Sequence, residues 1–251
     1  ARIQVEFVSA NPTGPLHAGS GRGAALGDTL AGLLAKAGYN VEREYYVNDA
    51  GTRLLAFFVS AYVRYAQKLG AAAEVPKDGY HGAYLAELAD ELVAEHGSSL
   101  LSDGVVTLLQ PGAVAVEVWQ GLSPADQDLT RTLGQQGIER MIEWARRDMT
   151  DLGVEFDFWF REQSLFDANL IASTTEYLRE RGHIDEREGA VWFTTSALGE
   201  DKDNVLVRSN GIPTYFASDI AYHRNKFLRR GFDRVIDIWG ADHQGHVPRM
   251  K

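Results

Sequence analysis

The hydrophobic and polar positions of the first seventy residues follow two alternating periods. Residues 2–9 form a short run rich in β-branched side chains, as in a buried strand. A helical pattern runs from Gly19 to Gly38, a second strand pattern covers 41–47, and a second helical pattern covers 52–69. Four leucines recur at helical spacing in the first of these helices: Leu26, Leu30, Leu33 and Leu34. This order predicts a Rossmann-like parallel α/β sheet.

The pattern changes after residue 70. Gly, Pro and one short amphipathic helix occupy 71–124 without a βαβ rhythm. The elements that follow are a helix over 125–152, a strand at 157–160, a helix over 165–181, paired strands at 191–194 and 205–208, a helix over 213–228 and a strand over 234–239. We therefore predict a first half of the sheet domain over 1–70, an α+β insertion over 71–204, and the start of the second half over 205–251. The chain opens on a strand without Met and stops where a helix begins, so we expect a piece of a longer protein.

Composition narrows the classes of function. Without Cys the chain has no disulfide framework, thiolate zinc site or Cys nucleophile. It has no run of 18 apolar residues, and it does not open on a positively charged start followed by an apolar stretch, as a secretory signal peptide does. We therefore expect no membrane partner and a cytoplasmic location. A net charge of −10 argues against a surface that binds nucleic acid all over. The densest basic stretch is either a local basic face or a solvated helix end, and it comprises His223, Arg224, Lys226, Arg229, Arg230 and Arg234.

The junction between the first strand and the first helix is a candidate ligand site. In an open parallel sheet this position binds ligands, and Gly19, Gly21 and Gly23 let the backbone approach a bulky one. Backbone N–H groups and the helix dipole favour a phosphate there. His17 could donate a hydrogen bond to a phosphate oxygen, although a lone histidine before a glycine is also typical of a structural turn.

A second candidate site lies on the helix predicted over 213–228. Tyr215 and Asp219 are four residues apart, so they share one helix face. The Asp219 carboxylate suits a bidentate pairing with a guanidinium, which could belong to a ligand or to the neighbouring Arg224. Pro213 is expected at the first helical position.

A third candidate site follows the strand over 234–239. Gly240 forms a turn there, Asp242 could accept hydrogen bonds from ribose hydroxyls, and His243 and His246 could reach a nucleoside or substrate. The same three polar residues could be metal ligands. That reading is weaker, because a third firm ligand and the helical His-Glu-x-x-His spacing are both missing.

The fifteen residues from Glu6 to Ser20 read Glu-Phe-Val-Ser-Ala-Asn-Pro-Thr-Gly-Pro-Leu-His-Ala-Gly-Ser. This segment resembles the His-Ile-Gly-His signature loop of class I aminoacyl-tRNA synthetases, in the form that the arginyl-tRNA synthetase family carries. The resemblance implies that His17 is the first signature histidine and Gly19 its glycine. Ser20 stands where the second histidine is expected, and its hydroxyl can donate a hydrogen bond but cannot carry charge.

The resemblance also implies two sets of binding residues. The arginine-binding set is Glu6, Ser9, Asn11, Tyr215, Asp219 and His243. The ATP-binding set is Pro12, His17, Gly19, Ser20, Gly240, Asp242, His243 and His246. His17, Gly19 and Ser20 are the expected catalytic positions.

The activity that the resemblance implies is formation of arginyl-adenylate from arginine and ATP with Mg²⁺, followed by transfer to tRNA(Arg). Catalysis would come mainly from positioning and charge stabilisation. We expect no structural metal and a monomer. The second signature, Lys-Met-Ser-Lys, and the anticodon-binding domain would lie outside these residues, so the 251 residues alone should not charge tRNA. The alternatives are a nucleotidylyltransferase of the same superfamily, and a catalytically impaired paralogue or arginine-binding module.

Overall fold

The computed structural model describes residues 1–51, 53–241, 245 and 247–250. The chain divides into two compact units, which are described separately. The first unit comprises Ala1–Ala10, Ala18–Asn48 and Val154–Lys251, and the second comprises Asn11–His17 and Asp49–Gly153. The helix after the second strand belongs to the second unit, whereas the sequence pattern had grouped it with residues 1–70.

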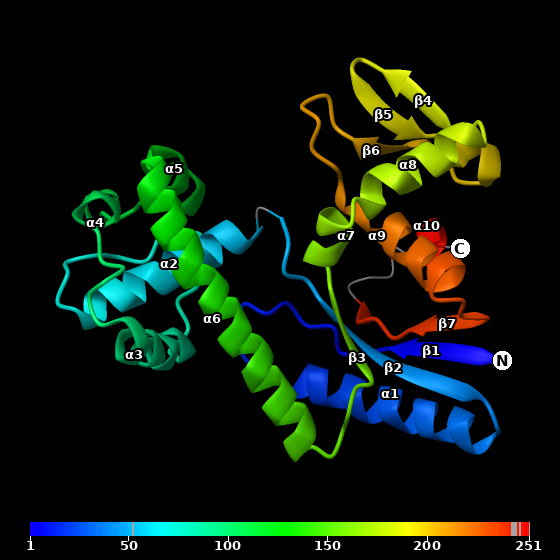
Figure 1. Cartoon of the computed structure of the whole chain (residues 1–251), viewed down its shortest axis with the longest axis horizontal. Helices are drawn as coiled ribbons and strands as arrows, with labels where there is room; N and C mark the ends of the chain where they lie inside the picture. Colours follow the sequence, from blue (N-terminus) through cyan, green and yellow to red (C-terminus); the bar gives the residue numbers. More distant parts are fainter. Residues whose placement is uncertain (52, 242–244, 246, 251) are drawn as a thin grey trace. The chain divides into compact units, whose positions relative to one another are not determined.

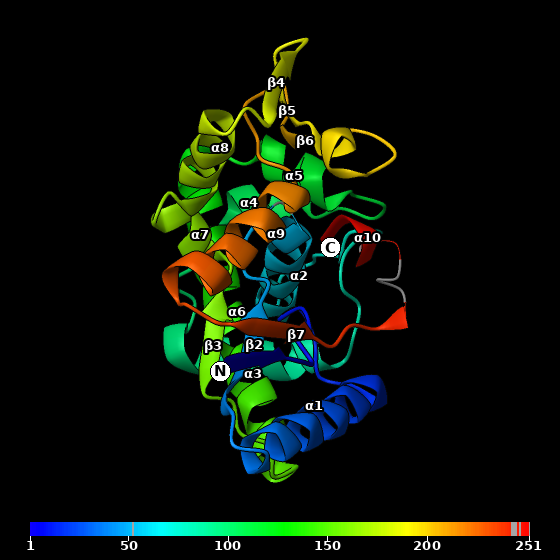
Figure 2. The same cartoon turned by 90° about the vertical axis from the view of Figure 1, so that its right-hand side faces the viewer.

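A parallel four-stranded sheet forms the centre of the first unit. Its strands are β1 (Arg2–Glu6), β2 (Asn40–Val47), β3 (Phe158–Arg161) and β7 (Arg234–Asp237), in the order β3-β2-β1-β7. Helix α1 (Ala18–Lys36) covers one face of this sheet and helix α9 (Tyr215–Arg224) lies on the other (Figures 1 and 2). The expected parallel α/β architecture is confirmed.

The strand order creates a topological switch point beside β1. From β1 the chain moves outward through β2 to β3, and β7 then adds on the opposite side of β1. The order therefore reverses between β1 and β7. Ligands of open α/β sheets bind at such a switch point, outside the carboxyl ends of the strands. In this unit those ends are Glu6 and Asp237, which are paired in register.

Helix α1 packs on the sheet through small residues. Its buried side is Ser20, Ala24, Gly27 and Ala31. A Cβ on Gly27 would lie 2.1 Å from the Phe7 ring, so the bulk of Phe7 requires glycine at this contact. Leu26 and Leu33, two of the leucines that mark the helix in the sequence, are 58% and 65% exposed.

A smaller antiparallel sheet completes the first unit. It consists of β4 (Ile184–Arg187), β5 (Ala190–Phe193) and β6 (Asn204–Val207), beside α7 (Gln163–Asp167), α8 (Leu170–Glu180) and the 3₁₀ helix η1 (Thr195–Leu198). The single helix predicted over 165–181 is interrupted, because Asn169 adopts a left-handed conformation with φ 52°. Residues of α8, β6 and α9 share one apolar core, which includes Ile171, Leu206 and Ala221.

Helix α9 begins and ends differently from the prediction. Thr214 is its N-cap and accepts a hydrogen bond from the backbone N–H of Ala217. Pro213 therefore precedes the helix, and the expectation that it holds the first helical position is wrong. After Arg224 the chain continues as a π-helix, η2 (Asn225–Arg229). The last described element is α10 (Val247–Met250).

The second unit is helical in its described part. Its helices are α2 (Arg53–Lys68), α3 (Tyr84–His96), α4 (Asp103–Leu108), α5 (Ala115–Gly121) and α6 (Pro124–Asp151). Tyr62 and Tyr65 of α2 are fully buried, and their hydroxyls donate hydrogen bonds to the carbonyl oxygens of Leu100 and Gly97. No helix among the described residues combines the length and apolar character needed to cross a membrane.

Candidate active site

The chain leaves β1 through a strained and firmly held turn. Val8 and Ser9 both have positive φ values, 67° and 43°, which non-glycine residues seldom adopt. The Ser9 hydroxyl donates to Glu6 Oε1 at 3.1 Å and accepts from the backbone N–H of Tyr46 at 3.0 Å. Backbone strain of this kind is a frequent property of functional sites, where surrounding contacts hold it in place.

Tyr45 supports the next residue of the same turn. Its hydroxyl hydrogen-bonds both the backbone N–H and the carbonyl oxygen of Ala10, at 3.1 and 3.2 Å. The Tyr45 ring is stacked on Trp159 of β3, with ring centroids 4.2 Å apart. The sequence analysis did not single out Tyr45. An aromatic residue near the end of a β-strand gives no signal of its own, because it is also typical of ordinary core packing.

The start of α1 suits a phosphate group. Gly19 is exposed in the first turn of this 19-residue helix, and a Cβ on Gly21 would have no heavy atom within 4 Å. A helix N-terminus with open space around its backbone is a favourable anion site. Ser20 is buried at the head of the small-residue side of α1. That position explains why a small side chain fits there, while the catalytic roles of Gly19 and Ser20 stay predictions.

Three other residues of the predicted nucleotide loop belong to the second unit. Asn11 and His17 are exposed and Pro12 is buried. His17 directly precedes the first residue of α1. Their predicted roles toward arginine and ATP stay predictions.

Tyr46, at the carboxyl end of β2, interacts with three carboxylates. Tyr46 hydrogen-bonds Glu162, and the charges of Glu162, Asp219 and Glu6 all act on it. Burial, together with these charges, raises the pKa of the Tyr46 hydroxyl well above its ordinary value, so it stays protonated. Glu162 is only 4% exposed and follows β3 directly. The sequence analysis missed Glu162, because a lone glutamate after a strand carries no distinctive spacing.

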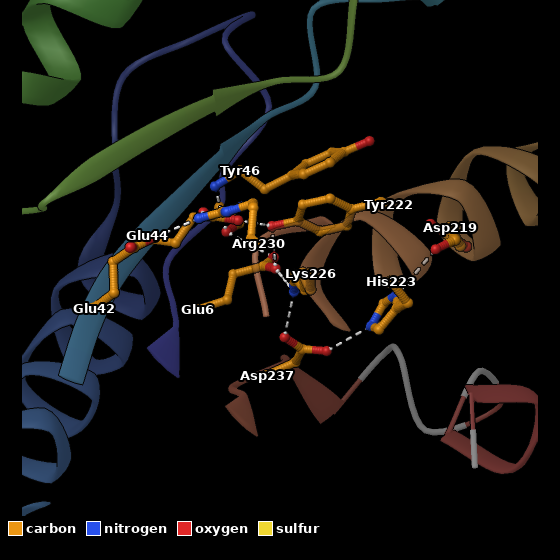
Figure 3. A network of polar contacts seen from close by, with 11 residues as sticks. Glu6, Glu42, Glu44, Tyr46, Asp219, Tyr222, His223, Lys226, Arg230 and Asp237 are labelled. Atoms are coloured by element: carbon orange, nitrogen blue, oxygen red, sulfur yellow. Dashed lines mark hydrogen bonds and ion pairs between the residues drawn. The ribbon is translucent and has the colours of Figure 1, made fainter. Parts of the chain in front are cut away.

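Tyr215 and Asp219 both lie on α9, four residues apart as predicted. Tyr215 is the first residue of the helix and is exposed, while Asp219 is half-buried. His223, one turn further on, places Nδ1 2.8 Å from the Asp219 carbonyl oxygen and Nε2 2.9 Å from Asp237 Oδ2 (Figure 3). This histidine thus connects helix α9 to the end of β7.

Arg224, the alternative partner considered for Asp219, makes other contacts. Its guanidinium donates to Thr174 Oγ1 at 3.4 Å and lies over the Tyr177 ring, 4.4 Å from the centroid. Both contacts are with helix α8.

Glu6 is buried and its carboxylate is held by the protein. Oε2 accepts hydrogen bonds from Lys226 Nζ at 2.6 Å and from the Tyr222 hydroxyl at 2.8 Å (Figure 3). Lys226 is 0% exposed. Neither reading of the basic stretch, as a local basic face or as a solvated helix end, holds for this lysine, because its side chain lies between α9 and the sheet rather than in solvent.

The third candidate site is described only in part. Gly240 follows the end of β7 and is exposed. The predicted residues Asp242, His243 and His246 lie outside the described residues, so their roles toward ATP and arginine stay predictions.

A parallel sheet whose strand order reverses between β1 and β7, a glycine-rich helix start and a group of carboxylates are the features expected of a synthetase catalytic domain. The family model described as tRNA synthetases class I (R), catalytic domain, matches residues 1–250. The chain belongs to this family.

Curated relatives specify the family further. The arginine–tRNA ligase of Dehalococcoides mccartyi (strain CBDB1) is 49% identical over 251 residues, and that of Caldanaerobacter subterraneus subsp. tengcongensis is 46% identical over 250 residues. Each match covers 100% of this chain and 41% of the relative. The chain therefore spans about two fifths of the length of these relatives.

Solved structures agree with this placement. A Campylobacter jejuni structure assigned as an arginyl-tRNA synthetase superposes with a TM-score of 0.82 at 34% identity, and it covers 100% of this chain and 50% of that one. Thermus thermophilus arginyl-tRNA synthetase superposes with a TM-score of 0.60 at 26% identity, over 90% of this chain and 36% of that one.

Proposed function

We propose that the protein containing this chain is an arginine–tRNA ligase. It joins arginine to ATP as arginyl-adenylate, with release of pyrophosphate, and then transfers the arginyl group to the 3′ end of tRNA(Arg). The observation that carries the proposal is the group of carboxylates around Tyr46, namely Glu6, Glu162 and Asp219, at the carboxyl edge of the sheet. A guanidinium offers planar, charged hydrogen bonding that matches carboxylates, so this group of residues suits the side chain of arginine.

The residues divide the reaction between them. Asp219 and Glu162 receive the side chain of arginine, and Tyr215 closes over it from the first turn of α9. His17 and the backbone of the first α1 turn bind the ATP phosphates, and Mg²⁺ enters with ATP as part of that substrate. The arginine carboxylate attacks the α-phosphorus, and the donors at the α1 terminus stabilise the charge that develops there. No covalent enzyme intermediate is needed.

The test is ATP–pyrophosphate exchange by the full-length protein, with arginine and citrulline as paired substrates. Citrulline has nearly the shape of arginine but lacks the charge, so exchange should require arginine. Exchange without any amino acid would indicate a nucleotidylyltransferase. Arginine binding without exchange would indicate a binding module. Both alternatives contradict the proposal.

A further inference from the structure

A buried ionic layer lies between the sheet and the segment that follows α9. Its members, which define the name, are Glu6, Glu42, Glu44, Lys226, Arg230 and Asp237 (Figure 3). It divides into two cation-centred parts. Lys226 pairs with Glu6 and Asp237, whereas Arg230 pairs with Glu42 and Glu44. The two parts meet at Tyr222, whose hydroxyl lies within hydrogen-bonding distance of both Glu6 and Glu44.

The π-helical segment η2 places Lys226 in this layer. The backbone N–H of Arg230 bonds the carbonyl oxygen of Asn225, five residues earlier, as in a π-turn. Single π-turns in helices are frequent at functional sites. Lys226 lies over the Tyr222 ring, with Nζ 4.0 Å from the centroid, and its ammonium pairs with carboxylates of the sheet.

The ammonium of Lys226 joins β1 and β7, the two strands at the switch point. Its Nζ lies 2.6 Å from Glu6 Oε2 on β1 and 2.8 Å from Asp237 Oδ1 on β7. Both oxygens of the Glu6 carboxylate are engaged, Oε1 by Ser9 and Oε2 by Lys226 and Tyr222, which favours a single orientation of the group. Charge-assisted hydrogen bonds of this kind add geometric specificity as well as energy.

We propose that Lys226 is a positioning residue for arginine: it holds the Glu6 carboxylate in one orientation beside the amino-acid pocket. The inference rests on the proposed function, which gives Glu6 a place in that pocket. Lys226 itself is separated from solvent and acts through Glu6. A purely structural lysine would stabilise the fold without selecting one ligand.

A double-mutant cycle on the full-length protein separates these roles. Lys226→Met should weaken arginine binding by about tenfold or more in calorimetry, and weaken ATP binding by less than about threefold. In a Glu6→Gln background the same substitution should change arginine binding by less than about threefold, because residues that act through one another are non-additive. Thermal unfolding of each variant shows that the comparison is made on folded protein.

Arg230→Met is the matched control. It removes the other cation of the layer, which pairs with Glu42 and Glu44 rather than with Glu6. It should lower thermal stability and leave arginine affinity within about threefold of wild type. If Lys226→Met does not fold, Lys226→Gln takes its place in the cycle, because it keeps one donor and drops the charge.

The outcomes are distinct. The positioning role would be overturned if Lys226→Met weakened arginine binding equally in the wild-type and Glu6→Gln backgrounds. It would also be overturned if the substitution weakened arginine and ATP binding equally. In either case, arginine-dependent exchange by the wild type would still support the proposed function. A wild-type protein that neither binds arginine nor catalyses exchange would overturn both proposals.

Discussion

Glu6 on β1 and Asp237 on β7 are paired in register on adjacent parallel strands, and the ammonium of Lys226 lies within 2.8 Å of both carboxylates. Two carboxylates at neighbouring buried positions repel each other unless a cation lies between them. The carboxyl ends of β1 and β7 therefore carry carboxylates whose charge the protein itself partly offsets.

The charge of Asp237 makes stability depend on pH. Burial alone would raise the pKa of Asp237, but the hydrogen bond from His223 and the charges of Lys226 and His223 outweigh it and lower the pKa to about 2. A depressed pKa contributes stability above the unfolded value, near 3.8, which is lost as the pH falls through about 2. We expect about 2 kcal/mol of unfolding free energy from this source. Urea unfolding of wild type and Asp237→Asn should be measured at pH 6 and at pH 3. The difference in unfolding free energy between the two proteins should be smaller at pH 3. An equal difference at both pH values would contradict the lowered pKa of Asp237.

Gly27 should be among the least replaceable residues of α1. A Cβ there would lie 2.1 Å from Cγ of the buried Phe7 ring, so Gly27→Ala forces the helix away from the sheet. We expect a loss of roughly 1–3 kcal/mol of stability, typical of overpacking. Gly32→Ala is the matched control on the same helix, because its Cβ would have no heavy atom within 4 Å. It should be neutral or stabilising, since alanine favours helix. Denaturant unfolding of both variants measures the contrast, and similar midpoints would refute it.

His17→Ala tests the proposed phosphate donor. Loss of one transition-state donor should reduce kcat for adenylate formation by roughly two to three orders of magnitude, with arginine affinity little changed. His81→Ala, another exposed histidine of the second unit, should leave the rate unchanged. Pre-steady-state kinetics of adenylate formation by the full-length protein measures the rate for both variants. A His17→Ala rate within a few-fold of wild type would remove this residue from the mechanism.

Asp219→Asn tests the proposed guanidinium partner. The substitution keeps the shape and drops the charge, so arginine binding should weaken by roughly 2–4 kcal/mol while ATP binding is nearly unaffected. Asp28→Asn removes a carboxylate of α1 that pairs with Arg43 at 2.8 Å, and should leave arginine binding unchanged. Calorimetry with each ligand in turn is the measurement. Equal losses for arginine and ATP would make Asp219 a structural residue.

The sequence by itself determined the class of fold and the identity of the family. Strand and helix periods are local properties, and a loop such as the one from Glu6 to Ser20 is read from contiguous residues. The spacing of Tyr215 and Asp219 could be placed on one helix for the same reason. Local pattern was less reliable at the ends of elements, where Thr214 rather than Pro213 starts α9.

Only the tertiary structure decided which face of α1 is buried. Helical spacing shows which residues share a face, but Leu26 and Leu33 are exposed while a stripe of small residues packs on the sheet. The reason is distant in sequence, since the Phe7 ring fills the space that a larger helix residue would need.

The buried ionic layer was likewise decided by tertiary structure. Glu6 and Lys226 are 220 residues apart, and nothing near either residue in the sequence indicates that they pair. The stretch around Lys226 had the composition of a solvated helix end. Lys226 itself is buried, because two carboxylates of neighbouring strands pair with its ammonium, and a buried ammonium is tolerated only where such partners surround it.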